Sequence, residues 1–251
     1  MDVNREDLNG SGERSPKTSE RIARRLVNYI IDNDLSAGTR LPNERELVES
    51  FGVGRTTVRE ALRLLETRGA ITIRSGPHGG PVIRRPRPED LSESLTLILQ
   101  FSGASLNDIL EARAALEPMM ARLAAERVTN AELIELDSTV EAMRANLGNH
   151  ELFLRENQRF HAGVAAATGS AVLRTFNDTL KAIADGAVVG VKYTPRRHAA
   201  VAAAHERVMV ALRAHDAVAA EAAMRTHVEE AGAYWRRHYP ALTSGGVRWI
   251  S

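Results

Sequence analysis

Three histidines of this chain occupy positions where histidine is seldom found. His161, His205 and His227 each fall in the apolar stripe of a different predicted helix, which would draw the three imidazoles into one interior. A buried imidazole without a partner is costly, and charged imidazoles would repel one another. Neutral imidazoles are good ligands of divalent ions such as zinc or nickel, so the pattern favours a metal site. Asn157, one helical turn before His161, can offer an oxygen ligand.

The competing interpretation treats each of these histidines as a core residue whose ring nitrogens find partners within the fold, as single buried histidines usually do. Four further histidines fall near the ends of predicted helices or beside charged residues, and we expect them at the surface: His150, His198, His215 and His238. The metal hypothesis therefore depends on the three histidines in apolar stripes.

A second group of residues indicates a different chemistry. Arg55, Thr56, Thr57 and Arg59 crowd the first turn of a predicted helix, where the helix dipole favours anions over cations. An external polyanion explains this placement. The two arginines can reach guanine edges or phosphates in the major groove of DNA, and the threonines can bind phosphates beside the free backbone N–H groups.

Two neighbouring features extend this predicted DNA-binding surface. Arg45, on the preceding helix, is placed to reach the flanking phosphate backbone. The tip formed by Gly76, His78 and Gly79 carries little side-chain bulk, so its backbone can approach DNA closely and lie in the minor groove.

These residues need a scaffold, and the surrounding pattern predicts one. Apolar residues at helical spacing predict helices over 18–33, 44–51 and 54–68, and Asn43 with Glu46 forms a capping box at the second. Alternation over 70–74 and 81–85 around a glycine-rich tip predicts a β-hairpin. Three helices followed by a hairpin is the order of a winged helix-turn-helix, whose second turn helix enters the major groove.

The remainder of the chain reads as helical throughout. The predicted helices cover residues 91–101, 106–127, 130–147, 151–168, 171–190, 196–215 and 217–239. The candidate caps near the starts of these helices are Asp108, Thr129, Asn149, Ser170 and Asp216. Such a series predicts an antiparallel bundle with room for a cavity between its helices.

The prolines and charges near residue 88 mark a boundary between these two parts. We expect a disordered arm over 1–17, a DNA-binding domain over 18–85, a linker over 86–90, a helical effector-binding and dimerisation domain over 91–240 and a tail over 241–251.

The overall composition narrows the class of protein. The 251 residues carry a net charge of +1, yet residues 14–87 hold fifteen Lys or Arg against eight Asp or Glu, which indicates a polyanionic partner. The chain has no cysteine, which excludes disulfides, a zinc finger and a thiol nucleophile. The polar start is unlike a secretory signal, and no apolar run approaches the roughly 18 residues of a membrane span. We expect a cytoplasmic protein with no membrane partner.

The segment LPNERELVESFGVGRTTVREALRLLETRGAI resembles the GntR family of bacterial transcription regulators, and the resemblance covers about residues 18–85. It implies DNA contacts by Arg45, Arg55, Thr57 and Arg59 together with the wing, and operators built as short TNGT…ACNA palindromes. Gly54 departs from the family pattern, which usually has Ser or Thr there, and so removes a side-chain cap.

The second part resembles the FCD effector domain of the FadR-type branch of that family. The segments that carry the resemblance are LNDILEARAALEPMMARLAAERVT, NQRFHAGVAAATG and AHERVMVALRAHDAVAAEAAMRTHVEEA. It implies that Asn157, His161, His205 and His227 bind a divalent metal ion and that Arg113 binds an effector. Asn157 stands where many members have Asp, which removes one negative charge from the metal site.

Arg113 allows two interpretations. It lies four residues before Glu117, so an ion pair within the helix is one possibility. The other places it in the effector pocket, where a guanidinium beside a metal ion with open positions would hold a carboxylate from two sides.

These expectations describe a mainly α protein, with an N-terminal winged helix-turn-helix and an all-α, FCD-like antiparallel bundle. They favour a ligand-responsive transcription repressor that senses a small carboxylate. A homodimer follows because one winged helix reads only half of a palindromic operator in double-stranded DNA. Two alternatives are a metal-dependent enzyme, for which no general base is apparent, and an architectural DNA-binding dimer with a purely structural bundle.

Overall fold

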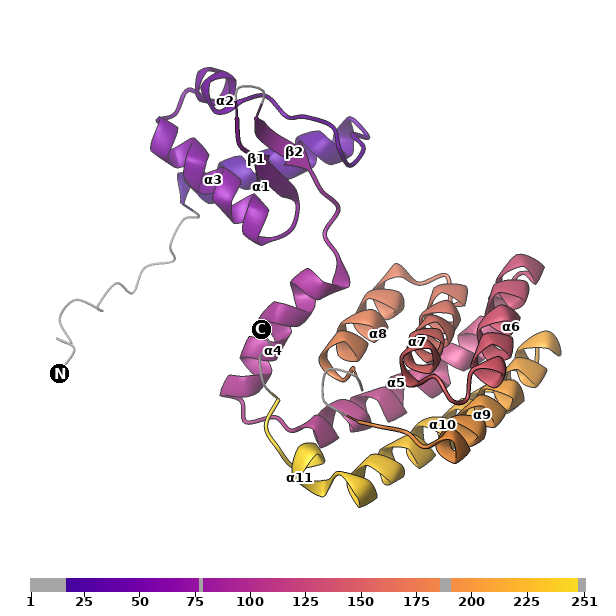
Figure 1. Cartoon of the computed structure of the whole chain (residues 1–251). Helices are drawn as coiled ribbons and strands as arrows, with labels where there is room; N and C mark the ends of the chain where they lie inside the picture. The colour runs from indigo at the N-terminus through magenta and orange to yellow at the C-terminus, as the bar shows by residue number, and fades with distance from the viewer. Residues whose placement is uncertain (1–16, 77–78, 186–190, 248–251) are drawn as a thin grey trace, which may run out of the picture. The chain divides into compact units, whose positions relative to one another are not determined.

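The chain forms two compact units that divide between Asp90 and Leu91. The computed structural model describes residues 17–76, 79–185 and 191–247, and Figure 1 draws the rest as a thin grey trace. His78 and the arm up to residue 16 lie outside the described residues. Each unit buries a hydrophobic core of its own.

The first unit has the winged helix-turn-helix order. Its elements are α1 (Thr18–Asp32), α2 (Glu44–Phe51), α3 (Arg55–Thr67), β1 (Ile71–Arg74) and β2 (Gly80–Ile83). The capping box predicted at the start of α2 is present, with Asn43 accepting from the backbone N–H of Glu46 at 3.1 Å. The apolar faces of the three helices meet in a core that includes Ile22, Leu26 and Leu62.

The two strands pair antiparallel, with Ile71 opposite Ile83 and Arg74 opposite Gly80. Ile71 and Ile83 are both buried and join the core of the three helices, so the hairpin is fixed at its base. Gly69, at a φ of +70°, makes the turn from α3 into β1, a conformation that favours glycine.

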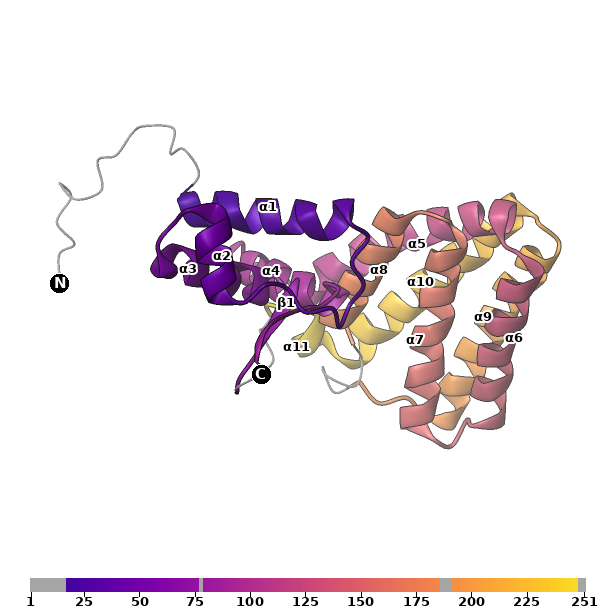
Figure 2. The same cartoon turned by 90° about the horizontal axis from the view of Figure 1, so that it is seen from above.

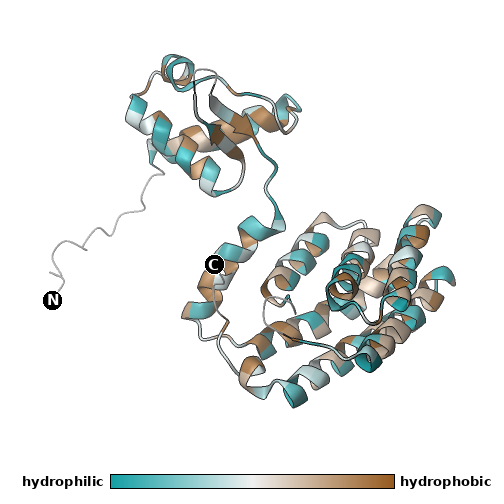
Figure 3. Cartoon of the chain, in the orientation of Figure 1, coloured by the Kyte–Doolittle hydropathy of each residue, from teal (hydrophilic) through white to brown (hydrophobic). Residues whose placement is uncertain are grey.

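The regular elements assigned within the described residues of the second unit are all helices. Its elements are α4 (Pro88–Phe101, which starts in the first unit), α5 (Leu106–Arg127), α6 (Asn130–Ala145), α7 (His150–Ala167), α8 (Ala171–Ile183), α9 (Pro195–Arg213), α10 (Ala217–His238) and α11 (Pro240–Thr243). Helices α6, α7 and α9 run side by side (Figure 2). Teal and brown alternate along the ribbons in Figure 3, as expected of amphipathic helices.

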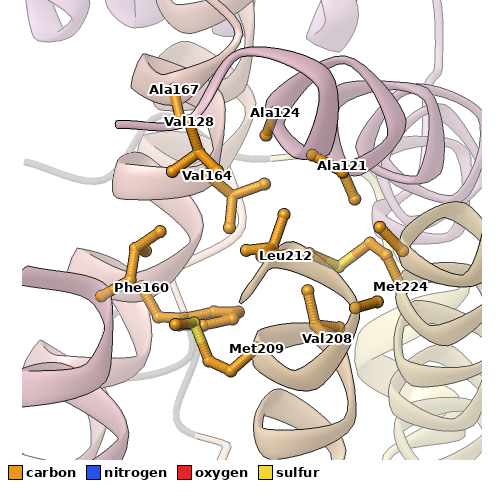
Figure 4. Packing of buried hydrophobic residues seen from close by; sticks show 14 of the residues in the cluster. Ala121, Ala124, Val128, Phe160, Val164, Ala167, Val208, Met209, Leu212 and Met224 are labelled. Carbon is orange, nitrogen blue, oxygen red and sulfur yellow. The ribbon is translucent and has the colours of Figure 1, made fainter. Parts of the chain in front are cut away.

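Small and large side chains fill the bundle core together. Ala121 and Ala124 of α5 allow neighbouring helices to approach closely, and Phe160, Met209 and Leu212 fill the space between them (Figure 4). The described helices do not combine the length and hydropathy that a membrane crossing requires. This packed core positions α5, α7, α9 and α10, which carry the candidate site.

The structure corrects several predicted boundaries. Helix α4 begins at Pro88, three residues before the predicted start, so it includes part of the predicted linker. Asp90 explains the early start, because it accepts the Arg87 N–H at 2.6 Å and pairs with Arg84 at 3.0 Å. The cap of α5 is Ser105, and Asp108 is its capping-box partner rather than the cap. Helix α8 ends at Ile183, well before the predicted residue 190.

The described part of the predicted tail is packed against the second unit. After α11, Val247 donates its N–H to the carbonyl of Ala104 at 2.9 Å, and Gly246 forms an isolated antiparallel bridge with Ser105. The Val247 side chain is buried in a cluster with Leu106 and Trp235. Residues up to 247 therefore stabilise the start of α5.

Candidate functional site

The N-terminal end of α3 exposes the residues that the sequence assigned to DNA binding. Gly54 precedes the helix in an extended conformation with no side-chain cap, as expected from its departure from the family pattern. Arg55, Thr56 and Arg59 are exposed, and Thr57 is half-buried. Two cations and two hydroxyls therefore stand at a helix end whose backbone N–H groups attract anions.

Arg59 reaches across to the neighbouring helix. Its guanidinium lies 3.2 Å from a carboxylate oxygen of Glu44 at the start of α2, and the two side chains are 57% and 38% exposed. Such a surface ion pair contributes little stability, so a phosphate or a base edge can replace Glu44 at low cost. Arg45 is also exposed on α2, beside the same surface.

The described part of the wing tip has little side-chain bulk, so its backbone could come close to DNA. Gly76 is exposed at a φ of +104°, in the range that favours glycine. A Cβ on Gly79 would lie 2.2 Å from the carbonyl oxygen of Arg74, so the turn has no room for a side chain there. His78, the third predicted contact at this tip, falls outside the described residues.

In the bundle, the three predicted metal ligands meet. The Nε2 atoms of His205 and His227 lie 3.0 Å apart, and that of His161 lies 3.3 Å from the Nε2 of His227. The three residues come from α9, α10 and α7, and all are buried. Phe160 stacks on the ring of His205 with centroids 4.0 Å apart, which fixes the orientation of that imidazole.

A carboxylate that sequence reasoning did not assign to the site orients His161. The Oε2 atom of Glu117 lies 2.6 Å from Nδ1 of His161, and its Oε1 accepts from Nε of Arg113 at 2.6 Å. Both interpretations of Arg113 are therefore compatible, since it pairs with Glu117 and also lines the pocket beside His161. The signal for Glu117 was its place on the same helical face as Arg113.

Burial keeps the three imidazoles neutral. It lowers the pKa of His161 to about 4, although Glu117 opposes this change. Burial also lowers the pKa values of His205 and His227 well below the usual range, and neighbouring histidines lower them further. Burial raises the pKa of Glu117, but Arg113 and His161 outweigh it, so this carboxyl titrates well below its usual range.

The chemistry of this donor set fits a divalent metal ion. The Glu117 carboxylate lies 2.6 Å from Nδ1 of His161, and its negative charge favours the tautomer with the proton on Nδ1. In that tautomer Nε2 has the lone pair and faces the other two rings. The three Nε2 atoms surround one space, and direct hydrogen bonds between neutral rings leave at least one lone pair unmatched. A cation accepts all three lone pairs. Glu117 would then be the carboxylate that orients a metal-bound histidine, His161.

One pocket leads to these residues. His161 and His227 line it together with Arg113 and Asn157, and its wall also includes Lys181. Asn157 is half-buried one turn before His161, so its role as a fourth ligand remains a prediction. Gln158 and Asp185 also line it, and the rest of the wall is apolar or aromatic, including Leu110, Tyr193 and Trp235.

Sequence reasoning missed Lys181. Burial, with Arg113 as the next cause, lowers the pKa of this lysine to about 7. The lysine is one of only three in an arginine-rich chain, and this rarity is the signal that the sequence offered. Its neighbours on the same helical face include Asn177 and Asp178, so no apolar stripe marked it. It adds a second positive group to the pocket that contains Arg113.

One surface prediction was wrong. His198 is 1% exposed, and its Nδ1 lies 2.6 Å from the carbonyl oxygen of Leu147. His150 is half-buried beside it, whereas His215 and His238 are exposed as expected. Position near a helix start did not imply exposure here, because the start of α9 packs against the start of α7.

Comparisons with known proteins agree with this arrangement. The model of the family described as bacterial regulatory proteins, gntR family, matches residues 18–77, and the FCD domain model matches residues 108–230. A protein of Edwardsiella tarda named HTH-type transcriptional repressor NanR is 29% identical over 87% of this chain and 85% of its own length. A Citrobacter rodentium protein of the same name is 28% identical, with the same coverage.

A solved structure shows the same architecture. The Streptococcus agalactiae GntR structure superposes with a TM-score of 0.70 at 28% identity, covering 86% of this chain and 99% of that one. These relatives are regulators and not enzymes, which overturns the alternative of a metal-dependent enzyme. The chain belongs to the GntR family of bacterial transcription regulators, as a member with an FCD domain.

Proposed function

We propose that the protein is a ligand-responsive transcription repressor in which a small carboxylate binds in the bundle pocket and changes the affinity of the winged domain for an operator. The observation that carries this proposal is the convergence of three neutral histidines and the Arg113–Glu117 pair on one pocket. The two relatives named as repressors support the direction of control. Regulation of bacterial genes places the protein in the cytoplasm.

The residues of the pocket have distinct roles in this proposal. His161, His205 and His227 hold a divalent ion, zinc or nickel, and Glu117 orients His161. When bound, the ion would offer open coordination positions to a carboxylate. Arg113, fixed by Glu117, then presents its remaining N–H groups to the same ligand.

The DNA side uses the surface at the start of α3. Arg55 and Arg59 read or clamp the operator, Thr56 and Thr57 bind phosphates, and the glycine tip of the wing approaches the minor groove. A homodimer would place two such surfaces on a palindrome. Effector and operator binding must then be reciprocally coupled, because each changes the affinity of the other by the same factor.

A melting-temperature screen tests the pocket. The full-length protein is loaded with zinc or nickel and heated with a panel of small carboxylates, alongside the Arg113→Ala variant. A ligand at about 100 times its dissociation constant adds roughly 2.7 kcal/mol of stability, which shifts the melting temperature visibly. A shift in the wild type that disappears in Arg113→Ala supports the proposal. Equal shifts in both proteins would remove Arg113 from the effector site.

A second experiment tests the metal site separately from the effector. His205→Ala should bind less zinc than the wild type, and its DNA affinity should equal that of metal-free wild type. If DNA binding collapsed while the variant remained folded by circular dichroism, the histidine cluster would be required for the DNA-bound form itself rather than for sensing.

A further inference from the structure

A pair of histidines lies in the bundle, apart from the three proposed to bind metal. His150 opens α7 and His198 lies in the first turns of α9, with their rings stacked at a centroid distance of 5.4 Å. The Nδ1 of His150 lies 3.1 Å from the Nε2 of His198, which is hydrogen-bond distance. One of these two nitrogens must therefore carry a proton and the other a lone pair.

The other nitrogen of each ring faces a backbone carbonyl. Nδ1 of His198 lies 2.6 Å from the oxygen of Leu147, and Nε2 of His150 lies 3.1 Å from the oxygen of Val191. A carbonyl oxygen only accepts hydrogen bonds, so both of these ring nitrogens must be donors.

Counting protons shows what this arrangement requires. Three contacts use the four ring nitrogens, and together they need three N–H groups. Two neutral imidazoles carry two. A neutral pair must therefore leave one contact without a proton: either a ring lone pair faces a carbonyl oxygen, or the two ring lone pairs face each other. A pair with one additional proton satisfies every contact.

The carbonyl of Val191 belongs to a segment that we call the pocket strap, residues 191–193. Val191 is buried in the cluster around Trp235, and Tyr193 lines the proposed effector pocket. The hydroxyl of Tyr193 accepts the indole N–H of Trp235 at 2.6 Å. The His150–Val191 contact therefore ties one wall of that pocket to the start of α7.

We propose that His150 and His198 together bind a single proton, and that this proton fastens the pocket strap to α7 and α9. The pocket wall would be held more firmly at mildly acidic pH than at alkaline pH. The consequence for effector binding rests on the proposed function, whereas the proton site and its hold on the strap do not.

The surroundings assign the charge within the pair. Burial lowers the pKa of His198, which outweighs the opposing effect of its hydrogen bond to the Leu147 carbonyl, and a charge on His150 lowers it further. His198 is 1% exposed and His150 is half-buried, so solvation favours the additional charge on His150. Macroscopic titration nevertheless belongs to the pair as a unit.

Other titratable groups surround the pair on each packed element. The ring of Tyr193 meets both histidines edge-on, at centroid distances of 6.2 and 5.9 Å. Arg197 of α9 lies over Tyr193 and over Tyr234 of α10. Exposed charges adjoin the pair along the chain at Glu151 and Lys192. The negative charge of Glu151 favours an added proton on the pair, whereas the positive charges of Lys192 and Arg197 disfavour it.

Fluorescence of Trp235 provides a readout that needs neither effector nor DNA. The chain has two tryptophans, so the titration uses full-length Trp249→Phe protein, with and without zinc, between about pH 5 and 8.5. We expect a one-proton transition in the range where histidines titrate, present in both metal states. His150→Gln, which cannot take up a proton, should abolish it.

Lys181→Gln is the matched control, because Lys181 lines the same pocket and its pKa of about 7 falls in the same window. The transition should persist in this variant. If it persisted in His150→Gln and vanished in Lys181→Gln, the lysine would be its source and the proposal would be overturned.

Ring nitrogen NMR decides the question without relying on a variant that folds. In the wild type near pH 6, nitrogen-15 spectra should show His198 protonated on Nδ1 and three ring protons shared by the pair. Two neutral rings at that pH, each protonated independently at lower pH, would contradict the proposal. Because no effector takes part, either result leaves the proposed function to its own test.

Discussion

Glu117 is the single residue on which the geometry of the bundle site depends most. It contacts His161 at 2.6 Å with one oxygen and Arg113 at 2.6 Å with the other. We expect Glu117→Gln to lower zinc affinity by about 10- to 100-fold, since carboxylates that orient a ligating histidine have effects of that size. Competition with a chromogenic chelator measures this. Glu126→Gln, at an exposed carboxylate on the same helix, should have no effect.

Arg55 is the corresponding residue on the DNA side. It is the first residue of α3 and exposed, next to a helix end without a side-chain cap. We expect Arg55→Ala to cost roughly 1–3 kcal/mol of discrimination between operator and altered operator if it contacts a base. Arg68→Ala, at the opposite end of α3, is the matched control. A uniform loss on all sequences would show that Arg55 contacts only phosphate.

The residue scale also shows how far sequence alone could go. The three histidines were predictable because each interrupts an apolar stripe, and the structure brings their Nε2 atoms together. The inward placement of Glu117 and Lys181 was not predictable, because a charged residue in a helix is usually at the surface and only tertiary packing turns it toward the interior. His198 was wrongly predicted at the surface because it lies near a helix start, and the sequence does not show which helix starts pack against each other.

At the scale of elements, two glycines flank α3 in different ways. Gly69 has a φ of +70°, and a Cβ there would lie 2.4 Å from a carboxylate oxygen of Asp90. Gly54 has a φ of −68° and open space around it. We expect Gly69→Ala to destabilise the winged unit by at least about 1 kcal/mol, because the residue is left-handed and crowded. Gly54→Ala should change stability far less, and urea denaturation of both variants compares them.

Some helices and strands were predictable from the local sequence pattern, and others were not. A capping box and helical periodicity predicted α2, periodicity predicted α3, and alternation predicted the hairpin, because these patterns depend on neighbours a few residues apart. The start of α4 was missed because it depends on the side chain of Asp90, which accepts the N–H of Arg87. The packing of Val247 was missed because its partner, the carbonyl of Ala104, is far away in the sequence. Equal effects of the two glycine variants would contradict this account of α3.

At the scale of the whole molecule, the buried histidines link stability to pH. Burial lowers the pKa of His161 to about 4, whereas an unfolded histidine titrates near 6.5. Between these values the unfolded chain binds more protons than the folded one, so the free energy of unfolding falls as the pH is lowered. For His161 alone this amounts to about 3 kcal/mol. His205 and His227 act in the same direction.

Chelator-treated protein melted at pH 7.5, 6.5 and 5.5 checks this expectation. The melting temperature should fall across the series, more between pH 6.5 and 5.5 than between pH 7.5 and 6.5, and His161→Gln should show a shallower decline. A melting temperature that did not change with pH would mean that the three imidazoles are not held neutral in the metal-free fold.

Operator affinity with and without effector tests the central claim most directly. The measurement is the dissociation constant of zinc-loaded full-length protein for a palindromic duplex, alone and with a saturating carboxylate identified by the melting screen. We expect a change of roughly 5- to 150-fold, the usual range of coupling between sites, and no change in Arg113→Ala. An operator affinity that stays the same at saturating effector would contradict the account, and the bundle would then be a structural partner of the winged unit rather than its sensor.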